Sequence, residues 1–399
     1  MNLDTSQKTA ICFAANNDLS LVTGGAGTGK TTIIKEITNR IGGREQYTLC
    51  APTGKAAARL REATGLHAST IHSMLSYNGS RFTAGSLAGQ TIIVDEGSML
   101  SSDLLAAIAR RRPHRIILVG DSSQLHPVGA GAPFHDIIKI QPSVVVELEH
   151  CYRSAEAVCQ AGNLVRAGQY PGTDIKSSNE HYQHIISQNP AAAEATIVDM
   201  AKRGELDFEK DIVLCPKNGK LDELENFAPC TRKSLNKKIV DAVNPHVDDA
   251  KWKIGDRIIS TKNFHKEDIW NGTTGTITAI DSEREIWIRP DMPVFNSEMN
   301  EYTDRVKFGK PMIAAMEHAY ALSVHKSQGS QYRKVIFCCF SRDAYRMINR
   351  ALIYTAITRA KNEVMVIGDK EAFTMGLQQQ EHKTTVLQEL AREAACQGQ

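Results

Sequence analysis

The stretch Gly24–Thr32, which reads GGAGTGKTT, constrains the fold more than any other part of the chain. It fits the pattern GxxxxGK followed by Ser or Thr, comes after an apolar run, LSLVT, and precedes a helix-like segment, TTIIKEITNRI. In a strand–loop–helix setting the glycines let backbone N–H groups surround phosphate oxygens, and the helix N-terminus adds a positive field. The sequence therefore predicts a site for nucleotide phosphates at the end of a buried strand.

The side chains of this phosphate loop have separate expected roles. Lys30 reaches the β- and γ-phosphates, and the Thr31 hydroxyl holds Mg²⁺. The other candidate nucleotide-binding residues of the loop are Gly24, Gly25, Gly27, Thr28, Gly29 and Thr32. ATP and Mg²⁺ are therefore the predicted cofactors.

Two series of short apolar runs indicate an α/β fold with two domains. Each run is continuous and rich in β-branched residues, which is typical of parallel strands buried on both faces, and helix-like segments separate them. The runs of the first series end at Thr23, Thr53, Glu96 and Asp121; those of the second cover residues 211–216, 319–324, 334–340 and 363–369. The length of 399 residues also favours two or three domains.

Two segments with a different residue pattern interrupt these series of apolar runs. Residues 254–310 contain GDRIIST, GTTGTITAI and REIWIRP, whose alternation and Gly/Thr content predict a small antiparallel sheet or barrel. Residues 76–90 carry an Asn-Gly pair that is typical of a hairpin. After Met375 the sequence predicts a terminal helix with a frayed end.

Polar residues follow the third and fourth runs of the first series. Asp95 is expected to anchor the Mg²⁺ shell, and Glu96 to polarise an attacking water. Adjacent acids at a strand end can also be no more than the start of a solvated loop. Gln124 is expected to bond the γ-phosphate or to position water, while Asp121 supports its loop.

Composition excludes some classes of protein and leaves others open. The net charge of +2 excludes a polybasic tail but permits a locally basic groove for nucleic acid. The nine cysteines form no CxxC pair and are read as reduced, with Cys338 and Cys339 as buried thiols. The N-terminus has no apolar signal core and no run has the length of a membrane helix, so we expect a soluble cytoplasmic protein that does not bind a membrane.

Eight motifs in one order resemble those of superfamily 1 helicases, and within them the RecD-like branch that includes the compact phage Dda type. The resemblance extends from about Gln7 to Gly368. The motifs are GGAGTGKTT, APTGKAAARL, STIHSML, IIVDEGSML, LVGDSSQLHPV, LEHCYRS, VHKSQGSQ and YTAITRAK. By this resemblance we expect a chain without a long N-terminal domain, like the compact phage form and unlike the bacterial recombination subunit. We expect it to act in a bacterial or phage-infected host cytoplasm.

The resemblance implies two RecA-like domains with ATP in the cleft between them. Residues 1–150 would form the first domain, with a strand-separating pin at 76–90, and residues 151–253 and 311–375 the second. Residues 254–310 would be an SH3-like insertion and 376–399 a C-terminal helix or tail. Arg153 and Arg359 match the arginine fingers of the family, although an arginine at a helix end is usually only a surface charge.

Other nucleotide contacts are also implied by the resemblance. Gln7 resembles the glutamine that reads adenine, although an N-terminal glutamine is often only a surface residue. In the connecting loop SVHKSQG, Gly329 would approach the nucleotide. The position two residues after this glycine is often glutamate in the family and is Gln331 here, so an amide would replace a carboxylate at the ribose.

The expected nucleic-acid contacts follow from the same comparison. His325, Lys326 and Ser327 would donate to phosphate oxygens. Pro52, Thr53, Gly54 and Lys55 match one strand-contacting motif of the family, and Thr70 and His72 match the next. His72 can equally be a capping or core histidine. Phe82, Phe264 and Trp270 are the candidate stacking platforms, with core packing as the alternative for each.

The combined prediction is a DNA helicase and translocase that depends on ATP and Mg²⁺ and moves 5′ to 3′ on single-stranded DNA. Its expected partners are single-stranded and forked DNA, with possible replication or recombination proteins, and it would act as a monomer. One alternative is a translocase that strips proteins from a strand or acts on RNA. Another is a nucleotide-gated assembly module with little turnover.

Overall fold

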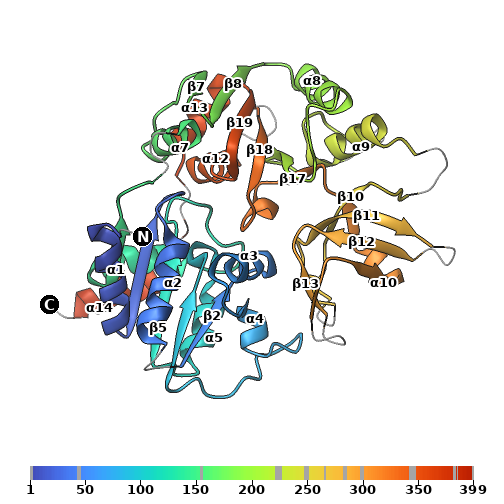
Figure 1. Cartoon of the computed structure of the whole chain (residues 1–399). Helices are drawn as coiled ribbons and strands as arrows, with labels where there is room; N and C mark the ends of the chain where they lie inside the picture. The colour runs from blue at the N-terminus through green and yellow to red at the C-terminus, as the bar shows by residue number, and fades with distance from the viewer. Residues whose placement is uncertain are drawn as a thin grey trace. The chain divides into compact units, whose positions relative to one another are not determined.

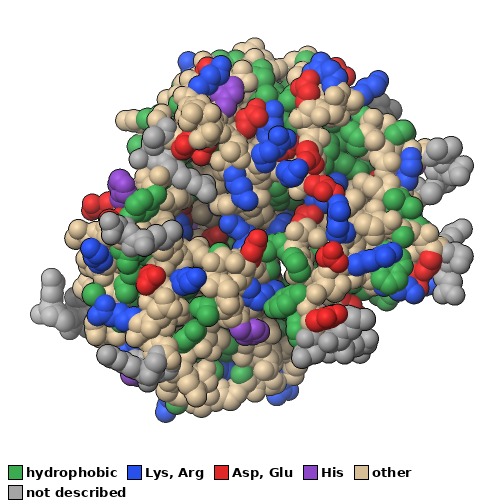
Figure 2. Space-filling view, in the orientation of Figure 1, with side chains coloured by type: hydrophobic (Ala, Val, Ile, Leu, Met, Phe, Trp, Pro, Cys, Tyr) green, Lys and Arg blue, Asp and Glu red, His purple; other side chains and the backbone are tan. Residues whose placement is uncertain are grey.

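The computed structural model describes residues 3–42, 46–152, 156–220, 227–246, 251–264, 267–281, 285–296, 301–340, 347–380, 383 and 385–397. The chain divides into two compact units (Figure 1). The first unit comprises Met1–Ala155 and Gln380–Gln399, and the second comprises Glu156–Gln379. Basic and acidic side chains are interspersed over the face drawn in Figure 2, in keeping with the small net charge of +2.

The first unit is built on a six-stranded parallel sheet with the strand order β3-β2-β4-β5-β1-β6. Four of its strands coincide with the continuous apolar runs of the sequence, which confirms the predicted α/β fold. The strands are β1 (Leu19–Gly24), β2 (Gln46–Ala51), β3 (Ala68–Thr70), β4 (Gln90–Val94), β5 (Arg115–Gly120) and β6 (Val145–Leu148).

Helices cover this sheet and bury an aliphatic core. On α2, the residues Ile33, Ile34 and Ile37 are fully buried and pack in one cluster with Ala10 and Ala14 of α1. The helical segments of the unit are α1 (Thr5–Asn16), α2 (Lys30–Ile41), α3 (Gly54–Thr64), α4 (Ile71–Met74), α5 (Ser102–Ala109), α6 (Pro133–Ile140) and α14 (Val386–Gln397), with short 3₁₀ turns at Gly97–Met99 and Pro142–Val144.

The C-terminal segment returns to the first unit. The Lys383 ammonium donates to the carbonyl oxygens of Pro127 and, at 2.8 Å, of Gly129. On α14, the Gln388 amide donates to the Asp136 carboxylate of α6, and Leu387 packs against the core of the unit. The chain therefore passes between the units twice, once before and once after the second unit in sequence.

The segment between α4 and β4 contains a tight turn. Tyr77 and Phe82 form an antiparallel bridge, and the Asn78 side-chain oxygen accepts from the backbone N–H groups of Ser80 and Arg81, at 3.2 and 3.0 Å. Gly79 has a φ of +95°, which a side chain would strain. The two arms of the turn are thus paired by an isolated bridge and not by a ladder of strands.

The second unit has its own six-stranded sheet, in the order β17-β9-β18-β19-β8-β7. Its pairs are parallel except for β7 and β8. The strands are β7 (Asp174–Lys176), β8 (His181–Ile186), β9 (Asp211–Cys215), β17 (Ala321–Ser323), β18 (Tyr332–Cys339) and β19 (Ala360–Gly368). The helical segments are α7 (Ala157–Arg166), α8 (Pro190–Lys202), α9 (Arg232–Val243), α12 (Arg350–Ile357), α13 (Lys370–Gln378) and the 3₁₀ turn His325–Ser327.

A five-stranded antiparallel sheet interrupts the second unit, with the order β15-β12-β11-β10-β16. It extends to His318, beyond the predicted end at Lys310, and encloses a core that includes Ile258, Ile288 and Phe308. Its elements are β10 (Arg257–Ser260), β11 (Thr274–Ile280), β12 (Ile286–Pro290), β15 (Val306–Phe308), α10 (Lys310–Ala314) and β16 (Met316–His318), with a separate pair β13 (Val294–Asn296) and β14 (Glu301–Thr303). Across the described ranges of both units, no helix has the length and apolar character that crossing a membrane requires.

Candidate active site

The order of the strands brings three polar segments of the first unit together. β5 lies between β1 and β4, and all three strands are parallel, so their carboxyl ends meet at one edge of the sheet. The phosphate loop follows β1, Asp95 and Glu96 follow β4, and Gln124 follows β5. This is the edge at which open α/β sheets bind ligands.

The phosphate loop has the backbone that its glycines predict. Gly27 and Gly29 have φ values of +81° and +83°, and Gly29 is the N-cap residue of α2. The Lys30 ammonium donates to the carbonyl oxygens of Gly24 and Gly25, both at 2.8 Å. A Cβ atom at Gly24 would lie 2.6 Å from the Thr28 hydroxyl, so a side chain there would push the loop apart.

Side chains of the loop have different degrees of exposure. Thr28 is buried, and its hydroxyl donates to the carbonyl of Gly25 at 3.0 Å, which holds the turn. Thr31 and Thr32, at the start of α2, are half-buried. Thr31 therefore remains within reach of the space at the end of the strand.

The two acidic residues after β4 occupy a strained turn. Glu96 has a φ of +51°, in the left-handed region that a non-glycine residue rarely adopts. Its Oε2 atom is buried and has no hydrogen-bond partner among the described residues. Burial and the neighbouring Glu96 charge raise the pKa of Asp95 to about 6, against the opposing effect of the Glu96 N–H and of Lys30. A buried carboxyl group whose pKa is raised by a neighbouring negative charge suits a site that receives a cation.

Gln124 lies in the loop after β5 with only 4% of its surface exposed. Its Oε1 atom is buried without a hydrogen-bond partner in the described part of the chain, whereas Asp121 accepts from the Ser123 N–H at 3.0 Å. Asp121 thus supports the loop. Gln124 and Glu96 each carry an oxygen acceptor without a partner among the described residues, and a bound water could donate to such an acceptor.

Gln7 is buried, although an N-terminal glutamine is often a surface residue. It completes a capping box with Asp4 at the start of α1, and its Nε2 atom donates to the carbonyl of Thr28 at 3.2 Å. The Tyr152 hydroxyl donates to Gln7 Oε1 at 3.0 Å and approaches Asp4 Oδ2 at 2.7 Å. Sequence reasoning did not single out Tyr152. Its position directly before Arg153 in the CYRS motif was the available signal.

The residues of the first unit fit a magnesium–nucleotide complex. The Lys30 ammonium is a cationic partner for phosphates, and the backbone N–H groups at the start of α2 are dipolar partners. Thr31 offers a hydroxyl and Asp95 a carboxylate, which are the oxygen ligands that Mg²⁺ prefers. In the loops after the neighbouring strands β4 and β5, two buried oxygens have no hydrogen-bond partner within the described part of the chain. The arrangement can bind phosphates, hold a divalent cation and position a water.

In the second unit, the candidate nucleotide contacts cluster around one loop. Gly329 has a φ of +72°, which explains the need for glycine there. The Arg359 guanidinium is 3% exposed and donates from Nη1 to the Ser330 carbonyl and from Nε to the Thr355 carbonyl, both at 3.2 Å. Gln331 is half-buried. Arg153 lies outside the described residues.

The connecting loop presents two of its three expected phosphate donors. His325 and Lys326 are half-buried, and Lys326 Nζ lies 3.4 Å from the Glu317 carboxylate. Ser327 is fully buried, and its hydroxyl donates to the Val324 carbonyl at 2.7 Å. The structure therefore gives Ser327 a role in holding the loop, and its donor is not available to a phosphate.

Two candidate strand-contacting threonines cap helices. Thr53 accepts from the Ala56 N–H at 3.2 Å to begin α3, and Thr70 accepts from the Ser73 N–H at 3.0 Å to begin α4. In each case the hydroxyl proton is left to donate elsewhere. Pro52 and Lys55 are half-buried, whereas Gly54 is buried.

An aromatic cluster lies beside α4. The ring centroids of Tyr77 and Phe82 are 4.9 Å apart, and His72 lies 5.3 Å from Tyr77 and 5.7 Å from Phe82. Arg111 donates to the Phe82 carbonyl at 2.8 Å. Two of the sequence candidates, His72 and Phe82, are thus brought together. In the second unit, Phe264 packs against the core of the five-stranded sheet, and the Trp270 indole donates to Asp268 at 2.8 Å.

The chain matches known protein families at both ends. Residues 2–186 match the family described as an AAA domain, and residues 318–367 match the UvrD-like helicase C-terminal domain. The chain is 28% identical to the RecBCD enzyme subunit RecD of Mycolicibacterium smegmatis, over 97% of this chain and 75% of that protein. It is 30% identical to the ATP-dependent RecD2 DNA helicase of Deinococcus radiodurans, over 98% of this chain and 52% of that protein, so it spans only about half of the second relative.

Solved structures agree on the fold. A Pif1 helicase from Bacteroides, in complex with ADP-AlF3 and ssDNA, has a TM-score of 0.52 and 20% identity, covering 100% of this chain and 98% of that chain. The Pif1 helicase of Candida albicans has a TM-score of 0.52 and 16% identity, with 100% coverage of both chains. At these identities the likeness supports the architecture alone.

The parallel sheets and the phosphate loop define the class of the chain as an α/β P-loop protein with the two-domain, RecA-like architecture. Within that class, the chain is similar over nearly its whole length to RecD and RecD2 proteins. These similarities are consistent with a superfamily 1 helicase of the RecD-like branch.

Proposed function

We propose that this chain is an ATP-dependent DNA helicase that moves on single-stranded DNA. One observation carries the proposal: the phosphate loop, Glu96 and Gln124 share one sheet edge. Glu96 and Gln124 each bring there a buried oxygen that has no hydrogen-bond partner among the described residues. A site of this kind binds a nucleoside triphosphate and holds a water beside it. The RecD2 relative from Deinococcus radiodurans is an ATP-dependent DNA helicase, and this supplies the proposed substrate class.

The residues of the first unit divide the chemistry among them. Lys30 and the N–H groups at the start of α2 bind the phosphates, and Thr31 and Asp95 hold Mg²⁺. The bound ion would neutralise charge on the β- and γ-phosphates. Glu96 accepts a proton from the attacking water, and Gln124 orients that water through its Oε1 atom. Gln7 reads the adenine edge.

The second unit supplies charge and grip in this proposal. Arg153 and Arg359 stabilise the charge that develops on the transferred phosphoryl group. Gly329 and Gln331 lie against the nucleotide, while His325 and Lys326 bond the strand. The first unit contacts the strand through three groups: Lys55 with its neighbours, Thr70, and the cluster of His72 and Phe82.

The inserted segments are proposed to act on DNA. Both units are RecA-like, the turn at residues 76–90 acts as a short pin, and the five-stranded sheet acts as an SH3-like subdomain that helps to hold the strand. The support is the aromatic pair Tyr77 and Phe82 beside the turn and the antiparallel order of the sheet. The pin is short, so we expect translocation to be more robust than unwinding.

A strand-displacement assay tests the direction of movement. A duplex with a single 5′ tail should be unwound in the presence of ATP and Mg²⁺, and a duplex with a 3′ tail should not. Unwinding of the 3′-tailed duplex alone would overturn the 5′ to 3′ direction but would leave the helicase proposal intact. Stimulation of ATP hydrolysis by RNA in place of DNA would instead favour an RNA translocase.

The variant Glu96→Gln tests the chemistry. Loss of the base should lower DNA-stimulated hydrolysis by about 10²- to 10⁴-fold while ATP binding is retained. Glu62→Gln, an exposed glutamate on α3, is the matched control and should hydrolyse ATP normally. A wild-type chain with no measurable hydrolysis would support the nucleotide-gated assembly module.

A further inference from the structure

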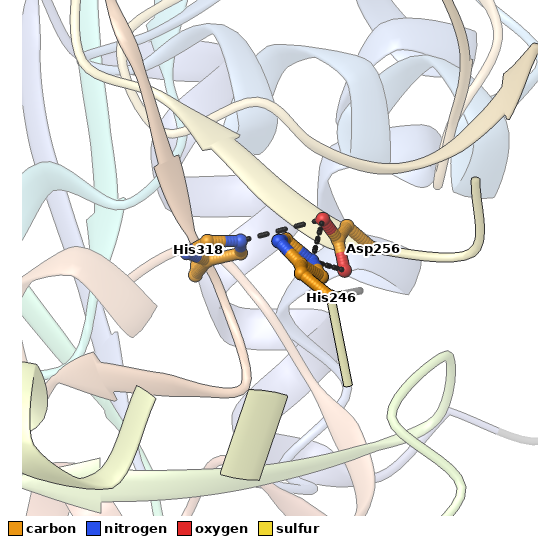
Figure 3. A group of neighbouring side chains, drawn as sticks. All are labelled: His246, Asp256 and His318. Atoms are coloured by element: carbon orange, nitrogen blue, oxygen red, sulfur yellow. Dashed lines mark hydrogen bonds and ion pairs between the residues drawn. The ribbon is translucent and has the colours of Figure 1, made fainter. Parts of the chain in front are cut away.

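Three side chains outside the proposed motor machinery gather in the second unit. His246 follows α9, Asp256 directly precedes β10, and His318 ends β16. Figure 3 shows both imidazole rings turned toward the Asp256 carboxylate. In sequence, Asp256 is 10 residues from His246 and 62 residues from His318, so no short sequence motif predicts the cluster.

The separations of these atoms suit a small metal ion. The Nε2 atoms of His246 and His318 lie 3.0 and 3.4 Å from Asp256 Oδ2, and the ligand atoms of all three residues lie within 4.8 Å of one another. Zinc bonds of about 2.0–2.2 Å to nitrogen and oxygen place neighbouring tetrahedral ligands roughly 3.3 Å apart. The two nitrogen–oxygen distances bracket that value, and 3.4 Å is long for a direct hydrogen bond.

The carboxylate is fixed by partners outside the cluster. Asn244 Nδ2 donates to Asp256 Oδ1 at 2.9 Å, and the Lys253 N–H donates to Oδ2 at 2.8 Å. These bonds fix the orientation of the carboxylate, and partners of this kind orient metal ligands in known sites.

The imidazoles are held but remain accessible. The Trp252 ring packs on His318 with ring centroids 4.7 Å apart. The side chains of His246 and His318 are 16% and 22% exposed, and both line a pocket of about 500 Å³. An ion could enter from this pocket, and water from it could complete the coordination.

We propose that His246, Asp256 and His318 bind one divalent transition-metal ion of the Zn²⁺ class, with water as the remaining ligand. Two imidazoles and a carboxylate are borderline ligands, which suit Zn²⁺ better than Mg²⁺ or Ca²⁺. The ion joins the segment after α9, which packs on the parallel sheet, to two strands of the five-stranded sheet. It therefore acts as a structural clip at the base of that sheet.

The experiment titrates Co²⁺ into the chelator-treated full chain without nucleotide and follows the visible d–d absorption. We expect one bound ion per chain, no thiolate charge-transfer band, and displacement by Zn²⁺. At a hundredfold excess over its Kd, Zn²⁺ should raise the unfolding temperature by about 5 °C. His246→Gln and His318→Gln should each weaken binding by at least about tenfold.

The chain supplies a matched control. His181 and Asp174 form a histidine–carboxylate pair at 2.6 Å that belongs to no three-residue cluster among the described residues, so His181→Gln should bind Co²⁺ as the wild type does. The wild-type titration decides the question even if a variant unfolds. Failure of the wild type to bind, a thiolate band that reports the cysteines, or equal loss in His181→Gln would each overturn the proposal and leave an ordinary hydrogen-bonded cluster.

Discussion

The hydroxyl of Tyr152 donates to Oε1 of Gln7 at 3.0 Å, across 145 residues of sequence. The backbone N–H of Tyr152 also donates to the Gly27 carbonyl at 3.1 Å, so one residue joins α1 to the phosphate loop. Because Gln7 Nε2 donates to Thr28, both ends of the amide are engaged. The amide that is proposed to read adenine is therefore held at Oε1 by Tyr152 together with the Asp4 N–H, and at Nε2 by the Thr28 carbonyl.

Removing that hydroxyl should loosen the recognition of the base. Tyr152→Phe loses hydrogen bonds worth about 1 kcal/mol, so the Kd for ATP should rise about fivefold and the preference for ATP over GTP should shrink. Competition binding of the two nucleotides measures both effects. Gln7→Ala should show a larger loss of preference. If Tyr152→Phe keeps the wild-type preference, Tyr152 does not set the amide.

Gly29→Ala should disable the phosphate loop. A Cβ atom there would lie 2.7 Å from Gln7 Nε2, at a φ of +83° that disfavours a side chain. Gly65→Ala is the matched control, because Gly65 has a φ of +70° with nothing within 4 Å of the added atom. Both variants should lose about 1–2 kcal/mol of unfolding free energy, and only Gly29→Ala should bind ATP at least about tenfold more weakly. Equal ATP affinity in the two variants would contradict this prediction.

Arg359 should matter for turnover more than for binding. Arg359→Ala should lower DNA-stimulated hydrolysis by about 10³-fold or more, and Arg359→Lys should recover only part of the rate because it lacks the planar fork. Phosphate release measures the rate, and thermal unfolding reports the loss of the bonds to Ser330 and Thr355. Arg333→Lys changes an exposed arginine paired with Asp211 and should leave the rate unchanged. A folded Arg359→Ala chain with the wild-type rate would remove Arg359 from the mechanism.

His135 should make the first unit sensitive to acid. Burial, and then the charge of neighbouring His126, lower the pKa of His135 from 6.5 to about 3. Between these values the unfolded chain binds a proton that the folded chain does not, so stability is full above pH 6.5 and falls as the pH decreases toward 3.

A comparison of variants isolates this contribution. Between pH 7 and pH 5, the shifted pKa of His135 should lower the unfolding free energy of the wild type by about 2 kcal/mol. The unfolding free energy of His135→Leu should fall by correspondingly less. Denaturant unfolding at the two pH values measures the difference. Equal losses in both proteins would show that His135 is not the group responsible.

Much of the parallel framework could be predicted from the sequence. Strands β1, β4 and β5 are continuous apolar runs because both faces of the sheet are covered, and that pattern is typical of buried parallel strands. Strand β8, with the sequence HYQHII, was missed because histidines and a glutamine interrupt its apolar pattern. Its place in the sheet depends on pairing with β19, which no local pattern reports.

The candidate site was predictable where short motifs carry it and not where tertiary contacts do. The phosphate loop, Glu96 and Gln124 each follow a recognisable strand. The positive φ of Glu96, the engagement of Gln7 by Tyr152 and the buried hydroxyl of Ser327 follow from packing. The cluster of His246, Asp256 and His318 likewise exists only through the fold.

The return of the C-terminal segment has a consequence for how the protein is made. The ribosome releases Met1–Ala155 long before it synthesises α14, whose Gln388 bonds to Asp136 of α6. All of the second unit emerges in the interval. Of the two units, the one translated earlier is thus completed later. During synthesis the surface of α6 stays uncovered until α14 has been made.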